Sequence, residues 1–82
     1  MKKKINVLKY TAIFEPAEEG GYTVTVPSLP GCITEGDTFE EATAMVKDAI
    51  RGYISVLKAD KEPIPVESEE HIAATILVPV PA

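Results

Sequence analysis

Apolar and polar residues alternate along the first part of the chain, with the two-residue period of β-strands. Residues 5–15 predict a long first strand that carries apolar side chains on both faces. Residues 22–26 predict a second strand, and 16–21, which end in two glycines, predict the hairpin loop between them. Prolines in 27–31 end the second strand, because proline cannot donate to a β-ladder. Residues 32–36 predict a short third strand.

The spacing of apolar residues changes to three and four after Thr38, which predicts an amphipathic helix. Thr38 and Glu41 match a capping box, in which each side chain accepts a hydrogen bond from the other residue's backbone amide. The apolar stripe consists of Phe39, Ala42, Val46, Ala49, Ile50, Tyr53, Ile54 and Leu57. The pattern ends near residues 60–61, and two prolines follow. Gly52 lies within the helix, which predicts a close approach of another backbone there, or else a local weakness.

The last part of the chain predicts a fourth strand. Residues 63–70 are an acidic, extended connector, and the strand follows over 71–80. One face of this strand is formed by Ile72, Ala74, Ile76, Val78 and Val80. The opposite face is also apolar, which favours an oligomer seam at Ile72, Ala74, Ile76 and Val78, with an interior strand of the sheet as the alternative. The expected fold is a single α+β domain over 1–82, in which one helix packs on a mainly antiparallel sheet.

Composition and charge narrow the classes of function. The 82 residues allow only a small core, so we expect a partner to supplement it. The formal charge of −5 argues against the whole domain binding nucleic acid, and favours a basic partner or simple solubility. One cysteine and one histidine exclude a disulfide framework and cannot build a structural zinc site unaided. We therefore expect no metal and no cofactor. No targeting or membrane-spanning segment is evident, which predicts a cytoplasmic protein.

The reactive side chains predict no enzyme. The carboxylates fall at strand ends, in turns and on the helix, not in the middle of an apolar strand where burial would tune a pKa. Two-metal nuclease chemistry is therefore not expected. Cys32 is expected to behave as a small buried hydrophobe, and His71 as a surface residue. The cluster Lys2–Lys4 predicts a solvated tail, with contact to RNA or to an acidic neighbouring subunit as the alternative.

The segment from Tyr22 to Ala42 resembles the signature of HicB-type antitoxins. It reads YTVTVPSLPGCITEGDTFEEA, and contains V-P-x-L-P-G-C followed by G-D-T-x-E-E-A at the start of the helix. The resemblance extends over about residues 7–66. It implies a partial ribonuclease H-like fold of order βββαβ without a ribonuclease active site, and a homodimer or homotetramer. It also implies a small basic partner, the HicA-type toxin that cleaves messenger RNA, whose active surface the antitoxin covers.

Many members of this family carry a further DNA-binding domain after the antitoxin domain. This chain ends at Ala82, so we expect no direct DNA binding from it. A face of acidic residues would steer association with a basic toxin, although solvation alone also explains such residues. The expected partner-binding residues are Glu18, Glu19, Pro30, Gly31, Glu35, Asp37 and Glu40. The alternative is a stand-alone homo-oligomer with a regulatory or scaffold role and no cognate toxin.

Overall fold

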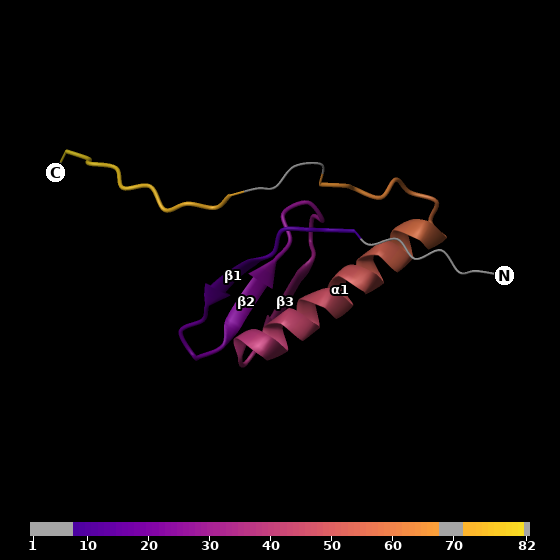
Figure 1. Ribbon diagram of the computed structural model, residues 1–82, viewed down its shortest axis with the longest axis horizontal. Helices are drawn as coiled ribbons and strands as arrows, with labels where there is room; N and C mark the ends of the chain where they lie inside the picture. Colours follow the sequence, from indigo (N-terminus) through magenta and orange to yellow (C-terminus); the bar gives the residue numbers. More distant parts are fainter. Residues whose placement is uncertain (1–7, 68–71, 82) are drawn as a thin grey trace.

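Three strands and one helix form the domain in the computed structural model, which describes residues 8–67 and 72–81 (Figure 1). The elements in chain order are β1 (Ile13–Pro16), β2 (Tyr22–Thr25), β3 (Ile33–Gly36) and α1 (Phe39–Ala59). The strands make one antiparallel sheet in the order β1-β2-β3, and α1 packs across one face of it. The predicted α+β arrangement of three antiparallel strands followed by a helix is confirmed.

The strand register separates a covered face of the sheet from an open one. Val24 pairs with Phe14 on β1 and with Thr34 on β3, and its side chain is fully buried under α1. Successive residues of a strand point to opposite faces. The open face therefore carries two neighbouring rows, one of Ile13, Thr25 and Ile33 and the other of Glu15, Thr23 and Glu35.

The first strand is shorter than the sequence predicts. β1 begins at Ile13, and residues 8–12 lie outside the ladder, whereas the alternating pattern predicted a strand from residue 5. Tyr10 and Ala12 nevertheless pack against the core from the predicted inner face. Residues 1–7, including Lys2–Lys4, lie outside the described residues. Alternation therefore identified the inner face of this segment but overestimated the length of its ladder.

The helix begins where the capping box predicts. The Thr38 side chain accepts a hydrogen bond from the Glu41 backbone amide at 3.0 Å, and α1 continues to Ala59. The close backbone approach predicted at Gly52 is wrong within the described chain, because a Cβ added there would meet no atom within 4 Å. The close approach occurs at Gly36, where a Cβ would lie 2.5 Å from the Ala42 backbone nitrogen. A glycine at the end of β3 thus lets the sheet and the first turn of α1 touch.

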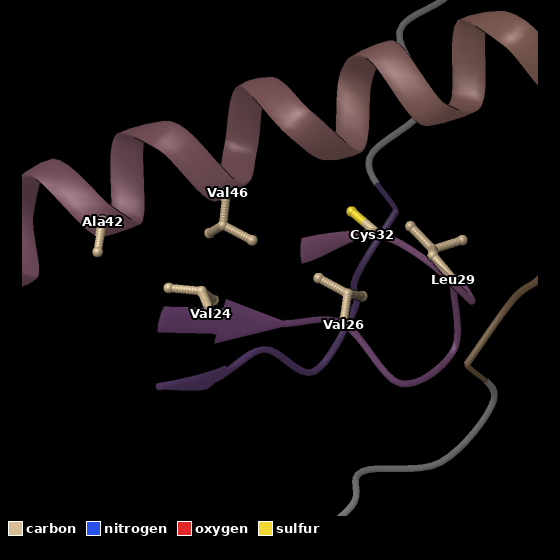
Figure 2. Packing of buried hydrophobic residues seen from close by; sticks show 6 residues of the cluster. All are labelled: Val24, Val26, Leu29, Cys32, Ala42 and Val46. Atoms are coloured by element: carbon tan, nitrogen blue, oxygen red, sulfur yellow. The ribbon is translucent and has the colours of Figure 1, made fainter. Parts of the chain in front are cut away.

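The hydrophobic core is small and lies between α1, β2 and the loop that joins β2 to β3. Its buried members are Val24, Val26, Leu29, Cys32, Ala42 and Val46 (Figure 2). Leu29 is fully buried although it belongs to a loop, and a hydrogen bond of 2.9 Å from its amide to the Val26 carbonyl holds that loop closed. Cys32 is 6% exposed, as predicted for a core residue, and burial raises the pKa of its thiol.

The predicted fourth strand is not formed. Residues 72–81 are part of no ladder and run away from the domain beyond β1 (Figure 1). Ile72 is 92% exposed and Leu77 is 90% exposed. A strand exists only where a neighbouring strand satisfies its backbone groups, and the described part of this chain supplies no such neighbour to the segment. His71 lies outside the described residues.

Candidate functional site

Five acidic residues line one surface groove, which we call the acidic groove. It lies between the β1–β2 hairpin loop, the end of β3 and the start of α1, and has a volume of about 670 Å³. Its acidic lining residues are Glu18, Glu19, Glu35, Asp37 and Glu41, and its other lining residues are Ala17, Gly20, Tyr22, Gly36 and Met45. The groove therefore joins acidic residues that are up to twenty-three positions apart in the sequence, from Glu18 to Glu41.

The hairpin loop brings Glu18 and Glu19 to the groove. Ala17 anchors the loop, because its amide donates to the Gly21 carbonyl and its carbonyl accepts from the Gly20 amide, both at 3.0 Å. Gly21 has a φ of +75°, and a Cβ there would lie 2.4 Å from the Gly36 carbonyl oxygen. Only glycine fits this conformation and this contact. The loop consequently closes on the end of β3, beside Glu35 and Asp37.

The start of α1 supplies the remaining side of the groove. Glu41 lies in the first helical turn, where the positive end of the helix dipole favours a negative charge. Met45, one turn later, is 44% exposed and lines the groove together with Tyr22. Tyr22 is fixed by two aromatic neighbours, with ring centroids 6.3 Å from Phe14 and 6.1 Å from Phe39. The acidic groove thus combines exposed acidic residues with the partly apolar side chains of Tyr22 and Met45.

The structure brings together four of the seven predicted partner-binding residues, namely Glu18, Glu19, Glu35 and Asp37. Glu40 lies in the same helical turn as Glu41 but does not line the groove, and Pro30 and Gly31 lie in the loop at the other end of β3. Glu41, Tyr22 and Met45 also line the groove but are not among the predicted partner-binding residues. The three-residue step from Thr38 to Glu41 identified a cap but did not show which of two adjacent glutamates faces the hairpin.

This arrangement suits the binding of a basic surface. Glu18, Glu19, Glu35, Asp37 and Glu41 are all exposed and remain in contact with water. Lysine and arginine side chains make their strongest hydrogen bonds with ionised carboxylates.

Within residues 8–67 and 72–81, no three or more His, Cys, Asp or Glu residues are grouped so as to hold a metal ion. Across the same residues, no helix is both long and apolar enough to cross a bilayer.

A second groove runs between the beginning of β3 and the second half of α1, and we call it the apolar groove. Its volume is about 460 Å³, and it is lined by Gly31, Cys32, Ile33, Ala49, Gly52, Tyr53, Val56 and Leu57. The Tyr53 hydroxyl donates a hydrogen bond of 2.8 Å to the Pro30 carbonyl oxygen and ties the helix to the loop before β3. The Pro30–Gly31 loop is therefore part of this groove and not of the acidic one.

Glu67 is a buried carboxylate that the sequence analysis did not distinguish from its acidic neighbours. It is 9% exposed and lies in the segment after α1. Its Oε1 accepts hydrogen bonds from the Thr11 amide at 2.7 Å and the Ser28 hydroxyl at 2.8 Å, and its Oε2 accepts one from the Thr11 hydroxyl at 2.8 Å. The Tyr10 hydroxyl also donates to the Pro65 carbonyl oxygen. Burial, and secondly the Glu67 charge, raise the pKa of Tyr10.

Comparison with known proteins shows which family this chain resembles. Residues 10–78 match the model of a family described as HicB_like antitoxin of bacterial toxin-antitoxin system. A UPF0150 protein of Thermoplasma acidophilum is 49% identical over 65 residues, which cover 79% of this chain and 94% of that protein. A UPF0150 protein of Synechocystis sp. is 43% identical over 61 residues, covering 74% of this chain and 77% of that protein.

A relative named Antitoxin HicB, from Escherichia coli, is 36% identical over 61 residues. These residues cover 74% of this chain but 44% of that antitoxin, so the similarity concerns less than half of the longer protein. The family match, in contrast, takes in all three strands, the helix, both grooves and Glu67. The chain therefore belongs to the HicB-like antitoxin family of bacterial toxin–antitoxin systems.

Proposed function

We propose that this protein acts as an antitoxin, which binds a small basic toxin of the HicA type through the acidic groove and covers the toxin's active surface. The observation that carries the proposal is a groove lined by five acidic residues, in a chain whose family is that of HicB-like antitoxins. The proposal assigns binding to this chain and no catalytic step. It places the protein in the cytoplasm, where a toxin that cleaves messenger RNA would act.

Charge complementarity would govern this interaction. A toxin that binds RNA needs a basic surface, and a groove of carboxylates offers that surface the negative charge it otherwise finds on phosphates. Long-range attraction of this kind raises the rate of association and weakens as salt is added. Tyr22 and Met45, which also line the groove, add apolar contact area. A standard interface buries about 800 Å² on each partner, which the groove and its surroundings can supply.

The test is a binding titration with the toxin-like protein encoded beside this chain's gene. The variant E35K/D37K reverses two charges in the acidic groove, whereas D48K/E62K reverses two exposed charges outside it. We expect E35K/D37K to weaken binding by at least about tenfold, mainly through slower association at low salt, and the control to change it much less. Equal effects of the two variants would contradict the assignment of this groove.

A growth-rescue assay examines the same proposal in cells. Co-expression of the chain should restore growth to cells that express the toxin-like protein, and E35K/D37K should restore it less well at equal protein level. If the neighbouring gene product neither binds the chain nor arrests growth, the stand-alone homo-oligomer becomes the better interpretation of this protein.

A further inference from the structure

Residues 72–81 present an extended apolar segment to solvent. Every residue of this segment is exposed, with Ile72 at 92%, Ile76 at 73% and Val80 at 80%. Apolar surface of this extent favours burial against another surface, because water is released when it is covered. In an extended conformation, both faces of this segment are apolar. It therefore has the side-chain pattern of a strand that is covered on both faces, but it lacks a ladder partner.

The same molecule offers a matching acceptor at the other side of the sheet. β3 is an edge strand, so the outward-directed backbone groups of Ile33–Gly36 are available for a further strand. The apolar groove lies directly beside this edge, and its lining residues Ile33 and Val56 are 63% and 60% exposed. Gly52 has open space above it, so a backbone can approach α1 closely at this point.

The segment's own domain does not bring it to this acceptor. Hydrogen bonds from Tyr10 and Thr11 to Pro65 and Glu67 hold the preceding residues beside the start of β1. Figure 1 shows residues 72–81 continuing beyond β1, on the side of the sheet away from β3 and α1. The donor strand and the acceptor edge of one chain thus lie on opposite sides of its sheet. A second copy of the chain can satisfy both.

We propose that residues 72–81 of one chain add as a strand to the free edge of β3 in a second chain. The face formed by Ile72, Ala74, Ile76 and Val78 then fills the apolar groove, and Leu77 on the other face lies against the open side of the sheet near Ile33. Pro79 and Pro81 cannot donate to a ladder and end the added strand. When the exchange is reciprocal, two copies close into a dimer with two equivalent interfaces.

Self-association measured on the full chain tests the proposal. Ile76→Asp places a charge on the donor segment and Val56→Asp places one in the acceptor groove. Val66→Asp is the matched control, since Val66 is 70% exposed but lies outside both surfaces. By analytical ultracentrifugation we expect the first two variants to raise the dimer dissociation constant by at least about tenfold and the control to leave it nearly unchanged. A monomeric parent chain, or an equal response of the three variants, overturns the proposal.

Crosslinking locates the contact and separates it from the alternatives. A photoreactive amino acid replaces Val78, and isotopically labelled and unlabelled chains are mixed before irradiation. Crosslinks from one isotopic form to peptide 49–57 or 31–36 of the other support the exchange. Crosslinks within one chain, or to peptide 8–16, overturn it, because they place the segment on β1 instead. Circular dichroism of each variant confirms that α1 is retained, which is expected because all the substituted side chains are exposed.

Discussion

The buried carboxylate of Glu67 offers the most direct test of how the segment after α1 is held to the domain. Three donors converge on it, namely the Thr11 amide, the Thr11 hydroxyl and the Ser28 hydroxyl, at 2.7–2.8 Å. Glu67→Ala removes the acceptor for all three and leaves a backbone amide without its partner. Glu67→Gln keeps the shape, because its carbonyl oxygen can accept two of the bonds and its amide group can donate to the Thr11 hydroxyl.

The expected magnitudes follow from this geometry. A hydrogen bond to a charged group contributes about 1.5–3 kcal/mol, and three bonds to one carboxylate do not add fully. We expect Glu67→Ala to lower the free energy of unfolding by about 2–4 kcal/mol, and Glu67→Gln by about 1 kcal/mol. At about 0.05–0.15 kcal/mol per residue, the whole 82-residue chain has a stability of about 4–12 kcal/mol. The alanine variant therefore loses a large share of the total.

Urea unfolding followed by circular dichroism measures these differences. The parent and variants are compared at one protein concentration, because self-association makes apparent stability depend on concentration. Glu62→Ala is the control, since Glu62 is an exposed glutamate of the same segment and its replacement should change stability by less than about 0.5 kcal/mol. A double-mutant cycle with Thr11→Val should show coupling of at least about 0.5 kcal/mol. Glu67→Ala with the stability of the Glu62→Ala control would refute the anchoring role.

Three further outcomes are expected. Leu29→Ala should lower the free energy of unfolding by about 2–5 kcal/mol in chemical denaturation, because Leu29 is fully buried; a loss below about 1 kcal/mol would contradict its core position. Gly36→Ala should lower Tm because its Cβ would meet the first turn of α1, whereas Gly52→Ala should raise Tm slightly. The raised pKa of Tyr10 means that its neutral form is favoured in the folded state. The contribution of Tyr10 to the free energy of unfolding should therefore be fully present below the unfolded pKa of about 10, and be lost as pH rises through the folded pKa. In unfolding measurements across alkaline pH, Tyr10→Phe should make this loss smaller.

Local sequence signals predicted the helix and the hairpin well. The start of α1 was predicted because the Thr38 side chain accepts a hydrogen bond from the Glu41 amide, only three residues along the chain. Two adjacent glycines marked the tight loop before Tyr22, and both have positive φ. Alternation identified Val24 and Val26 as inner residues. These features depend on contacts within a few residues, which is why the sequence alone reveals them.

Features that depend on distant contacts were missed or misassigned. The residue pattern of 71–80 predicts a strand, but it does not show which strand would pair with it. Residues 72–81 are part of no ladder. Glu67 belongs to an acidic run, which suggests a solvated side chain. It is buried because Thr11 and Ser28 converge on it, although they lie 56 and 39 residues away along the chain. The acidic groove likewise depends on the turn of α1 that directs Glu41 toward the hairpin.

The acidic groove and the apolar groove lie at opposite ends of β3 and beside different halves of α1. The two grooves share no lining residue, and an assembly joined through residues 72–81 would present one acidic groove per copy. Linked sites raise the effective concentration of a second binding event to the millimolar range when their spacing matches the partner. Valency, and not only the affinity of one groove, would then determine how firmly a paired or repeating basic target is held.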